Sequence, residues 1–403
     1  MPGKKRAVLQ SSSTYKVKVF CFSKQYDTSR KTGPIPRSGH RIVCNDRSMF
    51  AIGGYNPNVP LRNLDNSERR QSVHTVFQEI WRFDFDTKTW MKLESRNMTG
   101  ELASCGTAIS GNLLFLHGGT SYPFGQEINE DVFVCNLFTS DSIIEFKQID
   151  IVGSTKPPKQ YGQSIVVKGG YLYTVGGTDG HNYSMDVYRL NLRTRKWEKL
   201  TKSDGEEPRS RYRHEVVVYK DFLVVLGGGT SEIAFDFKKL PAFNVKSERW
   251  EILETQGDEL LHDLLPEGRR CHVCVQDPHD AAIVFINGGI NEDRPFNDTW
   301  RLNLRTLTWT EMPNMSLPYG IFFHTAAATP EGKMVIYGGV IARSADPTRT
   351  SDVYTSWITV PKLKHACWEA LMHYVNNGKI VIPDNIKKLG LPPQYEHRLK
   401  QCL

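Results

Sequence analysis

Short apolar runs that end in a pair of glycines recur through most of the chain. Six such runs occur, and they span Met49–Gly54, Leu113–Gly119, Tyr171–Gly177, Phe222–Gly228, Ile283–Gly289 and Met334–Gly339. Their first glycines are 65, 58, 51, 61 and 50 residues apart. A repeat with a period of about 50 residues predicts an array in which each repeat is one small β-sheet.

An alternating segment that ends in an aromatic residue follows most of the glycine pairs. The clearest copies are Trp81–Trp90, Val187–Trp197 and Trp300–Trp309, while the fourth repeat ends at Trp250 and the second has Phe146 instead. Alternation of apolar and polar residues is typical of half-buried strands. We therefore expect four-stranded sheets packed around one axis, because a sheet with two apolar faces needs neighbours on both sides. An unrelated β-sandwich with chance glycine pairs is the alternative, and six matching repeats disfavour it.

The sixth repeat is incomplete, since only Asp352–Val360 follows its glycine pair before Pro361. The alternating segment Tyr15–Phe22 has no other assignment, so we expect it to supply the outer strand of the last sheet and to close the ring. The alternative is an N-terminal tail that lies on the surface. The predicted domains are a flexible N-terminus at 1–14, a six-bladed β-propeller at 15–360 and a helical appendage at 361–403.

Composition and charge narrow the function classes only slightly. The 403 residues include 51 Lys and Arg against 44 Asp and Glu, and a net charge of +7 over this length does not argue for nucleic acid. No apolar run is long enough for a transmembrane helix, and the N-terminus lacks the apolar region of a secretion signal. Eight scattered cysteines fit a reducing compartment. We expect a cytoplasmic protein with no membrane partner, and a nuclear pool remains open.

Arginine and histidine recur just before the innermost strand of several repeats, at Arg37–His40, Arg211–His214 and Arg269–His272. If these arginines converge at one end of the axis, they form a positive site, because guanidinium groups bind carboxylates and phosphates in pairs of hydrogen bonds. The alternative is that some of them brace one blade against the next. The candidate substrate-binding residues are Arg37, Tyr161, Arg211, Arg213, Arg269, Arg270 and Ser231.

Enzymatic chemistry finds little support in the motifs. Cys271 and Cys274 form a lone pair on a predicted strand, where residues three apart face opposite sides and do not bind one zinc ion. The sequence contains no Walker A loop, no His-Glu-x-x-His motif and no Gly-x-Ser-x-Gly motif. We expect no catalytic residue, no cofactor and no metal.

The pattern changes from β to helical after Pro361. Apolar residues of Leu363–Leu371 repeat at helical spacing, Pro361 can open that helix, and Asn376–Gly378 can end it. A second helical stretch lies within Ile380–Gly390, and a last helix is predicted at Pro393–Leu399. Packing against the propeller is the simplest role for this appendage.

Leu363, Cys367 and Leu371 resemble the elongin-binding box of the VHL-box proteins, in which leucine and cysteine face elongin C. Downstream, the stretch around Ile386 resembles the segment by which these proteins select cullin-2. Its candidate cullin-binding residues are Pro383, Ile386 and Leu389.

Residues 36–400 as a whole resemble the kelch domain-containing protein 10 group. The resemblance is carried by the appendage and by Pro36–Arg41, Gly53–Pro57, Glu101–Ser104, Arg211–Glu215, Leu226–Ser231 and Arg269–His272. It implies an all-β fold, a six-bladed kelch β-propeller with a small C-terminal α-helical appendage. It also implies a substrate receptor that binds elongin C, elongin B and cullin-2, and whose propeller reads C-terminal degrons ending in Gly or Ala.

Two other readings compete with the ligase receptor. One is a non-catalytic kelch scaffold that binds a cytoskeletal or signalling protein and whose appendage packs intramolecularly. The other is an oxidase-like propeller enzyme, which would require a set of copper ligands that the sequence does not offer.

Overall fold

The computed structural model forms two compact units, one of Phe20–Thr359 and the other of Met1–Val19 with Val360–Leu403. The larger unit is the propeller and the smaller one is called here the appendage. The structure describes residues 15–28, 33–59, 75–138, 143–201, 207–259, 263–342, 347–376, 382 and 386–402. Within these residues no helix is long and apolar enough to cross a membrane.

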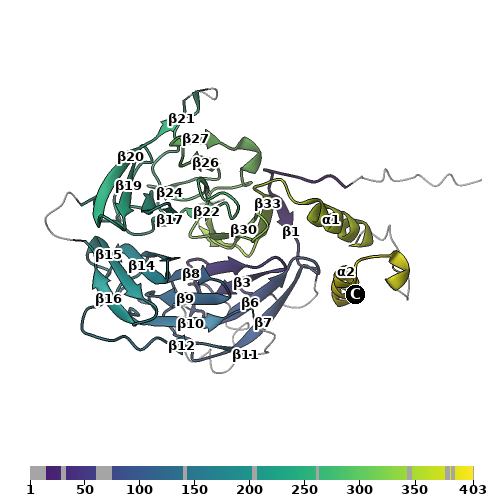
Figure 1. Ribbon diagram of the computed structural model, residues 1–403, viewed down its shortest axis with the longest axis horizontal. Helices are drawn as coiled ribbons and strands as arrows, with labels where there is room; N and C mark the ends of the chain where they lie inside the picture. The colour runs from purple at the N-terminus through teal and green to yellow at the C-terminus, as the bar shows by residue number, and fades with distance from the viewer. Residues whose placement is uncertain are drawn as a thin grey trace, which may run out of the picture. The chain divides into compact units, whose positions relative to one another are not determined.

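The first three blades follow one another along the chain, and each is built on antiparallel strands (Figure 1). Blade one contains β2 (Arg41–Cys44), β3 (Ser48–Ile52), β6 (Ile80–Asp84) and β7 (Thr89–Arg96). Blade two contains β8 (Gly106–Ser110), β9 (Leu113–His117), β10 (Val132–Asn136) and β12 (Lys147–Gln148). Blade three contains β13 (Ser164–Lys168), β14 (Tyr171–Thr178), β15 (Tyr183–Asn191) and β16 (Lys196–Lys199).

The last three blades repeat this order of strands. Blade four contains β17 (Glu215–Tyr219), β18 (Phe222–Leu226), β19 (Lys239–Asn244) and β20 (Arg249–Glu254). Blade five contains β22 (Val273–Gln276), β23 (Ile283–Asn287), β26 (Thr299–Asn303) and β27 (Thr308–Glu311). Blade six contains β29 (Thr325–Ala328), β30 (Lys333–Tyr337) and β33 (Val353–Trp357), and β1 (Ser23–Gln25) completes it.

Several shorter strands lie at the edges of the blades or in the loops between their strands. Strands β11 (Ile143–Glu145) and β21 (Gln256–Gly257) add parallel outer strands to β7 and β27. Small ladders pair β4 (Tyr55–Asn56) with β5 (Thr75–Val76), β24 (Ile290–Asn291) with β25 (Arg294–Pro295), and β31 (Val340–Ile341) with both β28 (Ile321–Phe322) and β32 (Thr348–Arg349). A 3-10 turn, η4 (Pro313–Met315), follows β27.

An N-terminal strand closes the ring, but it lies later in the chain than the sequence predicted. Ser23 of β1 pairs with Thr355 of β33, whereas the prediction placed the closing strand at 15–22. Phe20 adopts a left-handed φ of 54°, which interrupts an extended strand at that point. Phe20 and Phe22 instead pack into the core between blades five and six, where the sixth repeat has no outer strand of its own after β33. Strand pairing therefore begins only after these two rings.

The hydrophobic core of the propeller consists of clusters that each lie between two neighbouring blades. Trp90 packs against Tyr337 of the preceding blade at 5.0 Å between ring centroids. Trp197 and Trp309 are likewise buried in the clusters that join their blades to the preceding ones. Neighbouring sheets thus bury each other's apolar faces, which is why the fold needs a complete ring.

Backbone hydrogen bonds form a closed ring around the axis. Each N–H in this ring donates to the carbonyl of the corresponding residue in a neighbouring blade at 2.8–3.2 Å, and Gly39 closes the circle by donating to Phe323. Its members all have a positive φ, and they are Gly39, Ser104, Gly162, Arg213, Cys271 and Phe323.

The glycine pairs sit where the blades approach each other most closely. A Cβ atom on Gly53 would lie 2.5 Å from the Cβ of Leu102 in the next blade, and φ at Gly53 is 63°. The N–H of Gly54 donates to the carbonyl of Leu102, and the second glycine of every other pair makes the equivalent bond. Any side chain at these positions would separate the blades.

The appendage has its own small core. Helix α1 (Leu363–Asn376), the 3-10 turn η5 (Ile386–Leu389) and helix α2 (Pro393–Cys402) bury a cluster centred on Trp368 and Met372. Arg398 of α2 lies over the Trp368 ring at 4.5 Å. The two helices begin at the residues that the sequence pattern predicted.

Candidate functional site

The loops at one end of the axis are held together by short bridges between neighbouring loop residues. Each blade has a loop that leads into its innermost strand. The third residue before that strand pairs with the residue that follows the glycine pair of the same blade, as Ser38 does with Tyr55. The other bridges join Ala103 to Thr120, Tyr161 to Thr178, Tyr212 to Gly229, Arg270 to Ile290 and Phe322 to Val340. This end of the axis, lined by these pairs and by Arg213 and Arg349, is called here the mouth.

Arg37 is an internal brace of blade one and does not line the mouth. Its side chain is fully buried, with Nη1 donating to the carbonyl of Gly53 at 2.9 Å and Nε donating to the carbonyl of Ile35 at 3.0 Å. Nη2 donates to Glu79 at 2.5 Å, and the guanidinium lies 4.2 Å from the Phe77 ring centre. Every face of this cation is therefore occupied by its own blade.

Arg211 and Arg269 repeat the same arrangement in blades four and five. Arg211 donates to the carbonyl of Gly227 at 3.0 Å, and Arg269 donates to that of Gly288 at 3.1 Å and to Asp298 at 2.5 Å. Burial lowers the pKa of Arg211 to about 10. These positions correct the expectation that all the predicted arginines converge on the mouth. Three of them fix the loop entering a strand to the glycine pair of the same blade.

The recurring histidines join neighbouring blades. Nε2 of His214 lies 3.1 Å from the carbonyl of Val175 in blade three, and His40 makes the same contact with Tyr337 of blade six. Gln163 occupies this position in blade three. Burial lowers the pKa of His214 to about 3, and the charge of Arg211 adds to the effect, so the imidazole is neutral at physiological pH. These histidines are structural, as the alternative reading of the sequence held.

Arg213 is the arginine that the axial ring presents to the mouth. It is half-buried, its Nη2 donates to Oγ of Ser104, and its guanidinium lies 4.5 Å from the Phe323 ring centre. Burial lowers the pKa of Arg213. Within the described residues, its Nε has no hydrogen-bond partner and no carboxylate forms an ion pair with it. Arg213 is therefore a partly desolvated cation that makes no direct ion pair with a described carboxylate, and the charge of Glu215 reaches it only at longer range.

Arg270 and Ser231 lie together at the blade four side of the mouth. Nη1 of Arg270 donates to the carbonyl of Ser231 at 2.7 Å and to the carbonyl of Thr230. The N–H of Ser231 donates to the hydroxyl of Tyr183 at 3.0 Å, and the Tyr183 and Tyr212 rings are 5.2 Å apart. Arg270 thus orders the exposed loop that carries Ser231.

Tyrosines surround the cations on blades three and four. Burial raises the pKa of Tyr161, and the nearby charge of Arg213 partly opposes this increase. Burial also raises the pKa of Tyr212 to about 12, and Arg213 and Arg270 oppose it there too. Both phenols remain neutral hydrogen-bonding groups beside the two arginines.

A second cationic and aromatic group lies on the opposite side of the mouth. Nε of Arg349 donates to Oγ of Ser38 at 3.0 Å, and its guanidinium lies 5.2 Å from the Tyr55 ring centre. Tyr55 stacks on Tyr122 at 5.8 Å and meets Phe124 at 4.9 Å. Tyr122 and Phe124 are 39% and 45% exposed. Burial lowers the pKa of Arg349.

The axis continues below the mouth as a narrow cavity. Its walls include Arg41, which forms an ion pair with Glu215 at 3.4 Å and donates from Nε to the carbonyl of Cys105 at 2.7 Å. Burial raises the pKa of Glu215, and Arg41 opposes that rise. Cys271 also lines the cavity, and burial raises the pKa of its thiol to about 11. A buried neutral thiol of this kind is chemically inert.

The appendage displays part of the predicted elongin-binding box. Leu363 is 77% exposed and Cys367 is exposed, so both lie on the uncovered side of α1, whereas Leu371 is half-buried in the appendage core. Ile386 is buried and Leu389 is half-buried in that same core. The remaining predicted cullin-binding residue, Pro383, lies outside the described residues.

Comparisons with known proteins place this architecture in a family. The model of the KLHDC2/KLHL20/DRC7 Kelch-repeats domain matches residues 5–228 and 214–372. The chain is 36% identical over 372 residues to Kelch domain-containing protein 10 of Homo sapiens, covering 91% of this chain and 80% of the human protein. It is 37% identical over 384 residues to the Kelch domain-containing protein 10 homolog of Drosophila melanogaster, covering 91% of this chain and 62% of the fly protein.

The chain belongs to the kelch domain-containing protein 10 family. The chain spans less than two thirds of the length of the fly protein. A more distant relative, Kelch domain-containing protein 1 of Mus musculus, is 28% identical over 293 residues, covering 66% of this chain and 67% of the mouse protein. Kelch propellers bind partners, and the family match extends over both sides of the mouth.

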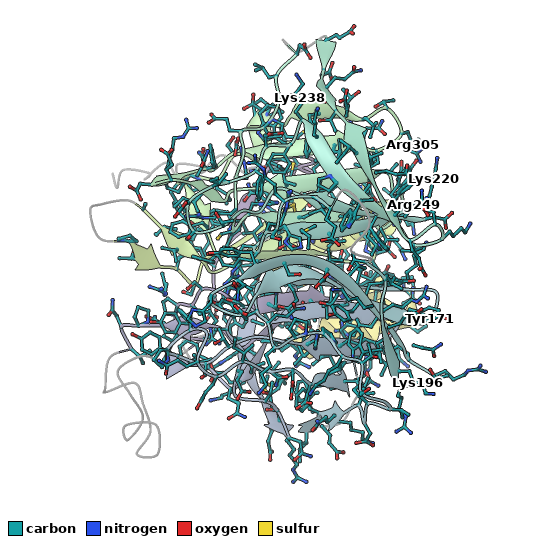
Figure 2. The ribbon with its side chains drawn as sticks, turned by 90° about the vertical axis from the view of Figure 1, so that its left-hand side faces the viewer. Tyr171, Lys196, Lys220, Lys238, Arg249 and Arg305 are labelled. Carbon is teal, nitrogen blue, oxygen red and sulfur yellow. The ribbon has the colours of Figure 1, made fainter. Side chains whose placement is uncertain are left out.

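The far ends of the kelch blades also carry cations, but in a different setting. Lys196, Lys220, Arg249 and Arg305 lie along one side of the propeller (Figure 2). Arg305 forms a two-point ion pair with Asp280 at 2.6 and 2.8 Å. These side chains project from turns between strands, where they are solvated, whereas the mouth arginines lie among aromatic rings.

Arg349, Tyr122 and Phe124 are mouth residues that sequence reasoning missed. Arg349 follows the sixth glycine pair by ten residues and lies on β32, which pairs with the strand after that glycine pair, as β5 and β25 do in the first and fifth repeats. Tyr122 and Phe124 lie in a loop between strands, outside the repeating pattern. Their signal in the sequence is only their place after a glycine pair, which is where loops of a propeller gather.

Proposed function

We propose that this protein is the non-catalytic substrate receptor of a cullin-2–elongin B/C ubiquitin ligase, and that its mouth binds C-terminal degrons ending in Gly or Ala. Arg213 is the observation that carries the proposal. It is a half-buried cation that forms no direct ion pair with a carboxylate among the described residues. A carboxylate suits this position, because a guanidinium group binds it through parallel, charge-assisted hydrogen bonds.

The shape of the mouth favours the end of a chain over its middle. The cavity along the axis has a volume of only about 10 Å³, which is too small for a polypeptide to pass. A peptide that reaches Arg213 therefore has to stop there, and its terminal carboxylate is then the group nearest the cation. Tyr161 and Tyr212 supply hydrogen-bonding and apolar contacts for the preceding residues.

The appendage supplies the second half of the proposal. Leu363 and Cys367 are exposed on α1 at a spacing of four residues, which aligns them on one face of the helix. An apolar helix face that binds in a groove of the partner is a common mode of protein recognition. The proposed partner with such a groove is elongin C. The receptor then acts by holding its substrate near a ubiquitin-loaded partner, which is a proximity effect. The cytoplasm is the proposed site of action.

The test of the mouth is a peptide titration followed by fluorescence polarisation. A labelled peptide ending in Ala or Gly with a free carboxylate should bind, and the same peptide with a C-terminal amide should not. Arg213→Ala should weaken peptide binding by about 10- to 100-fold, because the loss of a hydrogen bond to a charged group changes the binding constant by about this factor. Arg305→Ala on the far ends of the blades is the matched control and should bind normally. Equal binding of the amidated peptide would refute the carboxylate site.

The test of the appendage is co-expression with elongins B and C. Cys367→Asp places a charge in the apolar stripe of α1 and should abolish co-purification, since centrally buried anchors typically contribute 2 kcal/mol or more. Lys400→Ser, an exposed change on α2, is the control. A folded wild-type chain that does not co-purify with elongins would remove the ligase assignment.

A kelch scaffold for a folded partner is the second candidate. The observation in its favour is the exposed apolar rim of the mouth, where Tyr122, Phe124 and Ile233 are 39–48% exposed. Exposed apolar patches mark protein-binding surfaces. This candidate predicts that Phe124→Ser lowers partner binding while amidation of a peptide terminus has no effect.

A further inference from the structure

The N-terminal segment contributes a third element to the appendage. The hydroxyl of Tyr15 donates to Oε2 of Glu369 at 2.6 Å. Its backbone N–H donates to the hydroxyl of Tyr374 at 3.0 Å, and its ring lies 5.5 Å from that of His373. All three partners lie between positions 369 and 374 of α1.

These contacts occupy a different face of α1 from the predicted elongin stripe. Glu369 and His373 are four residues apart and therefore share one face of the helix. Leu363 and Cys367 share another face of the helix. An α-helix turns by about 100° per residue, so the side chains of Leu363 and Glu369 point about 120° apart around the helix axis. Leu363 and Cys367 remain exposed while Tyr15 is bound. The N-terminal segment thus supports α1 without covering that stripe.

The same segment is anchored in blade six only a few residues later. The N–H of Phe20 donates to the carbonyl of Trp357 at 2.8 Å, and that of Cys21 donates to Oγ of Ser356 at 2.9 Å. The appendage is therefore joined to the propeller by two stretches of chain, residues 15–20 and 357–363. Because the residues next to Tyr15 are held on blade six, Tyr15 has little conformational freedom even when it does not contact α1. Its contacts with α1 therefore form at a high effective concentration.

We propose that Tyr15 is a positioning residue for the elongin-binding helix, holding residues 369–374 of α1 folded through Glu369 and Tyr374. An isolated helix of the length of α1 is marginal in water, so its order depends on tertiary contacts. The appendage core contacts one side of α1, through Trp368 and Met372, and Tyr15 contacts another. The link to elongin rests on the proposed function, whereas the ordering of α1 does not.

The experiment uses the full-length chain and two readouts. Hydrogen exchange of residues 369–376 reports the order of α1, and titration with elongins B and C reports the binding face. Tyr15→Ala should raise exchange in 369–376 by about tenfold and weaken elongin binding by a similar factor, as expected for loss of a hydrogen bond to a charged group. Tyr26→Ala is the matched control, because Tyr26 lies in the same segment and is 68% exposed.

Conservative variants separate positioning from general destabilisation. Glu369→Gln keeps an acceptor for the Tyr15 hydroxyl and should retain most of the elongin affinity, whereas Glu369→Ala should lose it as Tyr15→Ala does. Peptide binding at the mouth should stay unchanged in every variant, which shows that the propeller is folded. Unchanged exchange in Tyr15→Ala would overturn the proposal. Raised exchange with unchanged elongin affinity would also overturn it.

Failure of the proposed function gives a different result. If the wild-type chain binds no elongin, the ligase assignment and the positioning role both fail. The exchange readout would still decide whether Tyr15 orders α1.

Discussion

At the scale of single residues, arginines from the same sequence motif have two different roles. Some are buried and stabilise their own blade, and others lie at the mouth as binding candidates. Arg269 is fully buried against Asp298, while Arg213 is half-buried and faces the mouth. The two sit two positions apart in the repeat, and Arg213 itself has a left-handed φ of 56°, whereas Arg269 does not.

The brace assignment predicts a stability loss that binding candidates do not share. Arg269→Met leaves the carboxylate of Asp298 without its cation and should lower the free energy of unfolding by about 3–5 kcal/mol. Arg294→Met is the matched control, since Arg294 is exposed and lies over the same Phe296 ring, and it should cost less than about 1 kcal/mol. Urea unfolding measures both. Equal losses would contradict the brace.

The buried histidines predict that acid destabilises the propeller. Burial holds the pKa of His214 at about 3 in the folded state, while the unfolded chain binds the proton below about pH 6.5. Between these values the unfolded state binds more protons, so stability falls as the pH falls. His214→Gln, which copies Gln163 of blade three, should reduce this slope by about 1.4 kcal/mol per pH unit between about pH 6 and pH 4. Urea unfolding across that range is the measurement, and an unchanged slope would contradict the assignment.

At the scale of elements, the closing strand β1 decides whether the last blade is complete. Removing residues 1–25 deletes β1, exposes the edge of β33 and takes Phe20 and Phe22 from the core. Burial of two aromatic side chains is worth roughly 3–6 kcal/mol. The melting temperature of this variant should therefore drop by several degrees, whereas removal of residues 1–14 should leave it unchanged. Calorimetry distinguishes the two, and equal melting temperatures would contradict the closure.

At the scale of the whole molecule, the proposed degron site and the proposed elongin-binding helix belong to separate compact units. Arg213→Ala should weaken degron binding by about 10- to 100-fold and leave elongin binding intact, whereas Cys367→Asp should abolish elongin binding and leave degron binding intact. Reconstituted ubiquitination of a degron-tagged substrate with elongins and cullin-2 should fail with either variant. Activity that survives either change would show that the corresponding unit is not used.

The repeating parts of this molecule were predictable because their causes are local. Glycine pairs mark points of close approach between blades, and alternating strands ending in an aromatic mark the buried faces, so both the number of blades and the helical appendage were expected. The position of the closing strand was not, because pairing of β1 with β33 joins residues more than 300 positions apart. The strand lies at Ser23–Gln25 because Phe20 and Phe22 pack into the core, and pairing with β33 begins only after them.

The candidate site shows the same division. The sequence by itself determined the fold family, the repeat motif and the types of residue near the axis, since these follow from periodicity and local propensity. Only the tertiary structure decided that Arg37 and its equivalents are braces, that Arg213 faces the mouth, and that Arg349 joins it from strand β32. Burial and partnership depend on which distant residues the closed ring brings together, and a one-dimensional pattern does not contain that information.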